Sequence, residues 1–64
     1  MMRSVGYDPL MSILEIEFTS GHVYQYGEIS QETYRELLAA DLMGQYFHAY
    51  ILDQYPYIKL RRRR

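Results

Sequence analysis

Glu15 and Glu17 have the spacing in this 64-residue sequence that comes closest to a catalytic pair. On a single strand, residues i and i+2 share a face and lie about 6–7 Å apart, which overlaps the separation of glycosidase carboxylates. A solvated sheet face, however, supplies neither a cleft nor the exclusion of water that raises a carboxyl pKa. We therefore interpret the two glutamates as the solvent side of a strand.

Histidine and cysteine give no metal site. His22 and His48 are the only histidines, and the sequence contains no cysteine. Neither histidine has a cysteine or an aspartate cluster at the spacing of metal ligands. The sequence also contains no glycine-rich phosphate loop and no nucleophile motif. We predict that the protein is not an enzyme and that it carries no cofactor or metal.

Tyrosine is the residue type that points to binding. The sequence has eight tyrosines, two phenylalanines and no tryptophan, and a tyrosine ring can bury its apolar body while its hydroxyl stays hydrogen-bonded. The pattern allows two roles for Tyr24 and Tyr26, which share a strand face: packing against the core, or direct contact with a ligand. Stacking on RNA bases needs exposed rings. The rings more suited to exposure are those of Tyr46, Tyr55 and Tyr57. For these three, contact with a protein partner or packing is the alternative to stacking on bases.

Basic residues gather at the end of the sequence. Arg61–Arg64 are four of the seven basic residues, so residues 1–60 hold three basic residues against eight acidic ones, a net charge of −5. Because affinity for nucleic acids comes from cations at the phosphates, any phosphate affinity must come mainly from these residues: Arg61, Arg62, Arg63, Arg64, Arg3, Arg35 and Lys59. The alternative is a solvated tail that improves solubility or contacts the acidic body of a neighbouring subunit.

Three strands are predicted in the first half of the chain, at residues 2–7, 12–18 and 22–27. In the second of these, Leu14, Ile16 and Phe18 alternate with the two glutamates, which is typical of a strand with one buried face. Turns at Asp8-Pro9 and Thr19-Ser20-Gly21 connect the strands into an antiparallel meander.

Two helices are predicted to follow, at residues 31–41 and 44–54. Ser30 is a favoured N-cap, apolar residues then recur at the spacing of an amphipathic helix, and Tyr55-Pro56 ends the second helix. The predicted core consists of Leu14, Ile16, Phe18, Leu37, Leu38, Phe47 and Ile51. The fold class is therefore α+β, with a three-stranded antiparallel meander followed by two helices packed on one sheet face.

Length limits the organisation to one domain over residues 1–60 and a basic C-terminal tail over residues 61–64. A core this small is marginally stable alone, and the first strand is a weakly protected sheet edge. We therefore predict a homodimer. The sequence has no apolar run near the roughly 20 residues of a membrane span, so we expect a cytoplasmic protein with no membrane contact.

The order of several short motifs resembles the KTSC family. The motifs are Gly6-Tyr7-Asp8, Leu14-Glu15-Ile16-Glu17-Phe18, Ser20-Gly21, Val23-Tyr24-Gln25-Tyr26, Gly44-Gln45-Tyr46-Phe47, Ile51 and Tyr55-Pro56-Tyr57. The resemblance covers residues 3–60. It implies a domain found at the C-terminus of some lysyl-tRNA synthetases and as a free-standing bacterial or phage protein, with RNA as the suggested ligand. This chain differs from the family pattern near Leu42 and His48, and it lacks basic residues near Leu52 and Gln54.

The sequence as a whole predicts a small non-catalytic binding module for RNA or another phosphate-bearing ligand. The alternatives are a protein-interaction module, such as a small phage or bacterial regulator that docks on a larger protein, and a purely structural homodimer. The candidate contact residues are Arg3, Tyr24, Tyr26, Tyr46, His48, Tyr55, Tyr57, Arg61, Arg62, Arg63 and Arg64.

Overall fold

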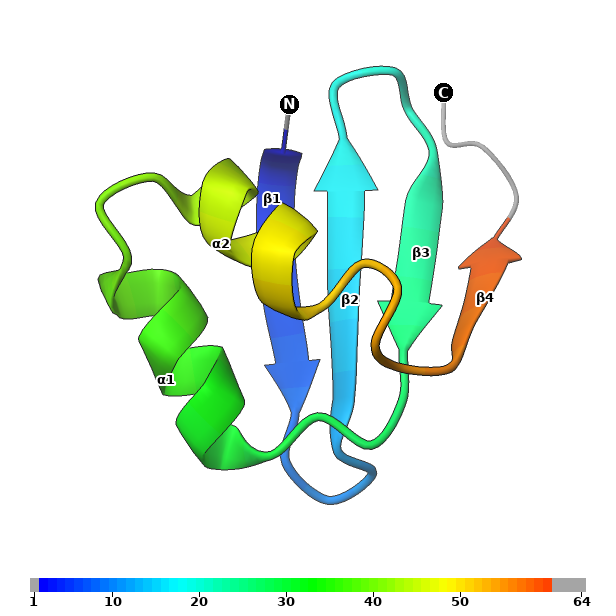
Figure 1. Ribbon diagram of the computed structural model, residues 1–64. Helices are drawn as coiled ribbons and strands as arrows, with labels where there is room; N and C mark the ends of the chain where they lie inside the picture. Colours follow the sequence, from blue (N-terminus) through cyan, green and yellow to red (C-terminus); the bar gives the residue numbers. More distant parts are fainter. Residues whose placement is uncertain (1, 61–64) are drawn as a thin grey trace.

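A computed structural model describes residues 2–60 of the chain, which form a four-stranded antiparallel sheet with two helices on one face (Figure 1). The elements, in chain order, are β1 (Met2–Asp8), β2 (Ile13–Phe18), β3 (Val23–Tyr26), α1 (Gln31–Ala39), α2 (Met43–Tyr50) and β4 (Tyr57–Leu60). The strands lie in sequence order across the sheet. The predicted α+β class is confirmed, with a three-stranded meander preceding two helices, and the structure adds a fourth strand after them.

Strand β4 pairs antiparallel with β3, where the sequence analysis placed no strand. Tyr57 lies opposite Tyr26, and Lys59 lies opposite Tyr24. The amide of Gly27 donates to the carbonyl oxygen of Pro56 at 2.8 Å, which aligns the chain just before β4. As a result β3 is an interior strand, and β1 and β4 form the two edges of the sheet.

The turns and the first helix cap follow the sequence signals. Asp8 Oδ1 accepts hydrogen bonds from the amides of Leu10 at 3.0 Å and Met11 at 3.3 Å, which stabilises the turn between β1 and β2. Ser30 Oγ accepts from the amide of Thr33 at 3.1 Å and caps α1. The predictions of a turn after Asp8 and of an N-cap at Ser30 are therefore confirmed.

The core lies between the helices and the sheet. Its buried residues are Leu14, Ile16, Tyr26, Ile29, Leu37, Phe47 and Ile51. Phe18 is half-buried and packs against this cluster. The prediction that Leu38 belongs to the core is wrong, because its side chain is 48% exposed while that of Leu37 is fully buried.

Helix α1 is fixed to the sheet through β1. The rings of Tyr7 on β1 and Tyr34 on α1 stack with centroids 4.6 Å apart. The Tyr7 hydroxyl also donates to the carbonyl oxygen of Ile29, just before the helix, at 2.6 Å. Helix α2 lies across β1 and β2, α1 lies at the β1 side of the sheet, and β3 and β4 extend beyond both helices (Figure 1). Within residues 2–60, neither helix is long and apolar enough to cross a membrane.

Candidate binding cleft

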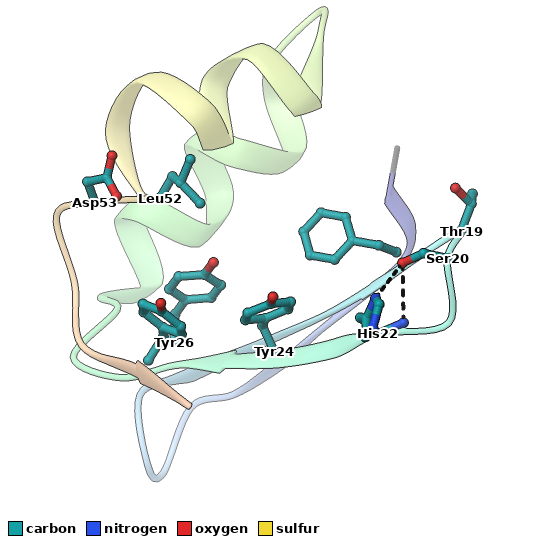
Figure 2. A pocket seen from close by; sticks show the side chains of 9 residues that line it. Thr19, Ser20, His22, Tyr24, Tyr26, Leu52 and Asp53 are labelled. Carbon is teal, nitrogen blue, oxygen red and sulfur yellow. Dashed lines mark hydrogen bonds between the residues drawn. The ribbon is translucent and has the colours of Figure 1, made fainter. Parts of the chain in front are cut away.

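A cleft of about 400 Å³ lies where the helices leave the sheet uncovered, and we call it the tyrosine cleft. Its lining residues are Phe18, Thr19, Ser20, His22, Tyr24, Tyr26, Leu52, Asp53 and Tyr57. The sheet forms one wall, and the segment that follows α2 lies over the other side (Figure 2). The volume falls in the range of about 300–1,000 Å³ that is typical of small-molecule sites.

Three tyrosines from two paired strands form the aromatic wall of the cleft. The ring centroids of Tyr24 and Tyr26 are 6.3 Å apart, and that of Tyr57 lies 5.7 Å from Tyr24 and 5.4 Å from Tyr26. Alternate residues of a strand share a face, which places Tyr24 beside Tyr26. The pairing of β4 with β3 then brings Tyr57 next to both, although it is distant from them in sequence.

The three rings differ in their exposure and so in their roles. Tyr26 is 1% exposed, and its ring meets that of Phe47 edge-on at 5.3 Å, so it belongs to the core as well as to the cleft. Tyr24 is half-buried, whereas Tyr57 is 55% exposed. Tyr57 therefore presents the most accessible ring face of the cleft, and Tyr26 holds the wall in place.

The hydroxyl of Tyr26 stays protonated well above neutral pH. Burial, assisted by the nearby Tyr24, Tyr57 and Asp53, raises the pKa of Tyr26 to about 12. Burial disfavours the charged phenolate, and a neighbouring carboxylate disfavours it further. At neutral pH the Tyr26 phenol is therefore uncharged, and its hydroxyl can act as a hydrogen-bond donor or acceptor.

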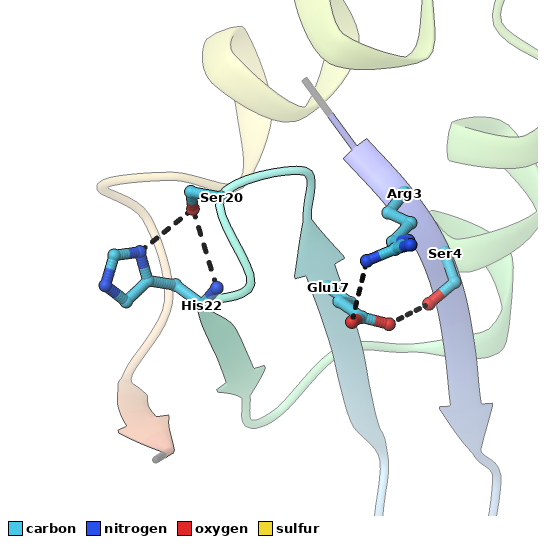
Figure 3. A network of polar contacts seen from close by, with 5 residues as sticks. All are labelled: Arg3, Ser4, Glu17, Ser20 and His22. Atoms are coloured by element: carbon cyan, nitrogen blue, oxygen red, sulfur yellow. Dashed lines mark hydrogen bonds and ion pairs between the residues drawn. The ribbon is translucent and has the colours of Figure 1, made fainter. Parts of the chain in front are cut away.

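Polar groups mark the two ends of the cleft. Asp53 lies across from Tyr26 on the segment that follows α2, and Ser20 and His22 lie at the far end of the cleft, in the turn between β2 and β3 (Figure 2). Ser20 Oγ and His22 Nδ1 are hydrogen-bonded at 2.9 Å (Figure 3). The Tyr57 ring is tilted by 49° from that of Tyr24 and by 34° from that of Tyr26. An aromatic wall that offers an exposed ring face, with polar groups nearby, suits a planar ligand that hydrogen-bonds at its edges.

Positive charge adjoins the cleft on β4. Lys59 lies opposite Tyr24 in the strand pairing, so its side chain leaves the same face of the sheet as Tyr57. The four predicted contact residues that follow β4, Arg61, Arg62, Arg63 and Arg64, lie outside the described residues.

The predicted contact residues of α2 and its surroundings lie apart from the tyrosine cleft. The Tyr46 hydroxyl donates to Glu36 Oε1 at 2.7 Å, and this hydrogen bond is the main reason that the pKa of Tyr46 rises to about 12. Its ring lies 4.8 Å from that of Tyr50. Tyr55 is half-buried against the core, and His48 is exposed on α2. The structure thus brings together Tyr24, Tyr26 and Tyr57, and it leaves Tyr46, His48 and Tyr55 outside the cleft lining.

The opposite face of the sheet carries the two glutamates and Arg3. Arg3 Nη1 lies 3.9 Å from Glu17 Oε2, and Ser4 Oγ donates to Glu17 Oε1 at 3.2 Å (Figure 3). Gln25 Nε2 donates to Glu15 Oε1 at 3.0 Å. The carboxylates are thus held by neighbouring strands on the face away from the cleft. Among the described residues, no group of three or more histidine, aspartate or glutamate side chains is arranged to hold a metal ion.

Sequence reasoning missed the ends of the cleft. Asp53 precedes the Tyr55-Pro56-Tyr57 motif, but only the turn after α2 and the pairing of β4 bring its carboxylate to Tyr26. Phe18 was expected in the core, and it contacts both the core and the cleft, with its ring 5.7 Å from that of Tyr24. No local pattern in the sequence signals either position.

Comparisons with known proteins agree on one family. The sequence profile of the KTSC domain matches residues 1–55. An uncharacterized protein of Stutzerimonas stutzeri is 43% identical over 54 residues, which cover 84% of this chain and 76% of that protein. A KTSC domain protein of Yersinia pestis, solved by crystallography, superposes with a TM-score of 0.90 at 28% identity, covering 94% of this chain and 84% of that one.

A lysine–tRNA ligase of Nostoc sp. is also similar to the chain. The two are 36% identical over 59 residues, which cover 92% of this chain but only 10% of the ligase. The similarity therefore concerns a small part of the ligase, which is a much longer protein.

Proposed function

The chain belongs to the KTSC domain family, and we propose that it is a non-catalytic module that binds single-stranded RNA, or another phosphate-bearing ligand with a planar base, in the tyrosine cleft. The observation that carries the proposal is the convergence of Tyr24, Tyr26 and Tyr57 on one cleft next to the cationic Lys59. The similarity to part of a lysine–tRNA ligase, a protein named for a tRNA substrate, gives independent support.

Stacking supplies the first part of the binding energy. A base docks on the face of an aromatic ring, and each stacked base contributes about 1–3 kcal/mol to binding, whichever of the four bases it is. Tyr57 offers an accessible face, and the half-buried Tyr24 lies 5.7 Å away by ring centroids. A base inserted against Tyr57 would therefore also meet Tyr24.

Phosphate contacts supply the second part. Lys59 lies beside the aromatic wall, and the sequence continues from β4 into four arginines. Because residues 1–60 carry a net charge of −5, the basic end of the chain must provide most of the attraction to phosphates. Binding should then weaken steeply as salt is added.

The proposal is tested with a fluorescently labelled single-stranded RNA heptamer at low salt. Tyr57→Ala should weaken binding roughly 5- to 150-fold, the equivalent of about 1–3 kcal/mol. Tyr50→Ala is the matched control, because Tyr50 is similarly exposed at 59% but lies on α2 outside the cleft lining. Equal effects of the two substitutions, or no binding by the unaltered chain, would contradict the proposal.

A protein partner is the second candidate, and the charge of the cleft favours it. Among the described lining residues Asp53 is acidic and none is lysine or arginine, which suits a basic side chain as well as a base. Such binding would rest on buried aromatic anchors, so truncation after Leu60 would leave it intact and salt would change it little. RNA binding would instead weaken strongly on the same truncation and depend less on salt.

A further inference from the structure

We propose that the tyrosine cleft selects guanine, with the Asp53 carboxylate accepting hydrogen bonds from the Watson–Crick edge of a guanine that stacks on Tyr57 and meets the tilted ring of Tyr24 at its edge. The inference rests on the proposed function and adds to it the identity of the preferred base. It follows from the position of one carboxylate at the end of an aromatic cleft.

The backbone around Asp53 is well fixed. The buried Ile51 anchors the segment, because its amide donates to the carbonyl oxygen of Phe47 at 2.9 Å. The amide of Leu52 donates to the same oxygen at 3.0 Å, and that of Gln54 donates to the carbonyl oxygen of Ile51 at 3.1 Å. Asp53 is thus presented by a hydrogen-bonded turn rather than by a loose loop.

The carboxylate itself is available for a ligand. Asp53 is exposed, and within residues 2–60 it takes part in no hydrogen bond or ion pair. It lies close enough to Tyr26 for its charge to raise the pKa of that phenol. A ligand that enters the cleft beside the tyrosines therefore meets, near Asp53, two acceptor oxygens that no other group within residues 2–60 uses.

The chemistry of the bases then decides which one fits. An ionised carboxylate only accepts hydrogen bonds, through two oxygens side by side. Guanine presents two neighbouring donors on its Watson–Crick edge, N1–H and the 2-amino group, so it can bind both oxygens in the paired geometry that strengthens such contacts. Adenine and cytosine offer one amino group beside an acceptor nitrogen, and uracil offers one N–H between two carbonyl oxygens that the carboxylate repels. Recognition of this edge is the usual mode of sequence-specific binding to single-stranded RNA.

The test uses RNA heptamers of uridine that carry one central guanosine, inosine, adenosine or cytidine. With the unaltered chain, the guanosine heptamer should bind roughly 5- to 150-fold more tightly than the adenosine heptamer, the discrimination expected of a bidentate contact. Inosine lacks only the 2-amino group, so its heptamer should fall between the two. This comparison needs no substitution in the protein.

Two substitutions assign the preference to Asp53. Asp53→Asn should reduce the ratio of guanosine to adenosine affinity to near one. Asp41→Asn removes the same charge from an exposed residue outside the cleft lining, so it should leave that ratio unchanged. Because the ratio is taken within each variant, the general gain in RNA affinity from losing a negative charge cancels.

The outcomes separate the two proposals. Equal affinity of the unaltered chain for all four heptamers overturns the choice of guanine and leaves RNA binding standing. A guanosine preference that survives Asp53→Asn overturns the role of Asp53. If no heptamer binds, both the inference and the RNA proposal fail, and the protein-partner candidate takes their place.

Discussion

At the scale of single residues, Tyr26 connects the core of the molecule to the tyrosine cleft. Its ring is buried against Phe47, and Tyr26 also belongs to the cleft lining with Tyr24 and Tyr57. The sequence left two roles open for it, packing and ligand contact. The structure shows the packing against Phe47, and ligand contact in the cleft is our proposal. Its pKa of about 12 means that ionising it in the folded protein is costly.

We predict that the free energy of unfolding decreases as the pH rises from about 10 to about 12. In the unfolded chain Tyr26 ionises near the ordinary tyrosine pKa of 10.0, whereas in the folded protein it stays protonated up to about 12. The folded state therefore holds more protons in this range, so stability falls with rising pH, by up to about 3 kcal/mol for this residue. The contribution is fully present below pH 10.

Urea unfolding at a series of alkaline pH values measures this decrease. Tyr26→Phe removes the ionisable group and should flatten the decline in stability. Tyr46→Phe tests the other tyrosine with a raised pKa, which rises mainly through the hydrogen bond to Glu36. A decline in stability that is the same with and without the Tyr26 hydroxyl would show that this phenol is not held neutral by the fold.

At the scale of elements, α1 shows how adjacent leucines acquire different environments. Both Leu37 and Leu38 fit the apolar stripe of an amphipathic helix, but Leu37 is fully buried and Leu38 is 48% exposed. The helix lies at the β1 side of the sheet (Figure 1), and its contact through Tyr34 and Tyr7 sets its rotation. Only a narrow part of the stripe therefore faces the core.

This difference gives a matched pair of substitutions. Leu37→Ala should destabilise the protein by about 2–5 kcal/mol, because it leaves a cavity in the core. Leu38→Ala should change stability by only about 0.5 kcal/mol, as is usual for surface positions. Both place the same residue in the same helix, so the difference in helix propensity cancels. Similar unfolding midpoints in urea for the two variants would contradict the described orientation of α1.

Local sequence patterns could predict the elements in which apolar residues recur regularly and turn or capping residues mark the ends. Two such elements are strand β2, in which Leu14 and Ile16 alternate with two glutamates, and helix α1, which Ser30 caps. Strand β4 is four residues long, from Tyr57 to Leu60, and its pairing with β3 depends on the path of the chain after α2. Because that pairing also brings Tyr57 to the cleft, the site could be predicted only in part: the tyrosines were identified, and Asp53 was not.

At the scale of the whole molecule, the sheet leaves both β1 and β4 as edges. Unpaired edge strands favour pairing with a second chain, and Ile58 on β4 is 57% exposed. We keep the prediction of a homodimer on these grounds. Its apparent melting temperature should rise with protein concentration, because association favours the folded state. Sedimentation of a 7.7 kDa monomer at high micromolar concentration would contradict it.

The tail and the cleft make different contributions to the proposed RNA binding, and the dependence of RNA affinity on salt concentration distinguishes them. Removal of residues 61–64 should weaken RNA binding and reduce the salt dependence, by up to about 0.7 in slope for each phosphate of the single strand that the shortened chain no longer neutralises. Tyr57→Ala should weaken binding while leaving the slope unchanged, since stacking involves no counterion release. If the truncated chain binds RNA with an unchanged slope, the phosphates are held elsewhere.

The central claim is that the tyrosine cleft is the binding site, and an NMR titration of the isotope-labelled chain with a single-stranded RNA heptamer tests it most directly. The expected result is a set of shifted amide signals centred on His22, Tyr24, Asp53 and Tyr57, with the opposite sheet face around Glu15 unaffected. Shifts confined to that opposite face or to α1, or no shifts at low salt, would contradict the claim.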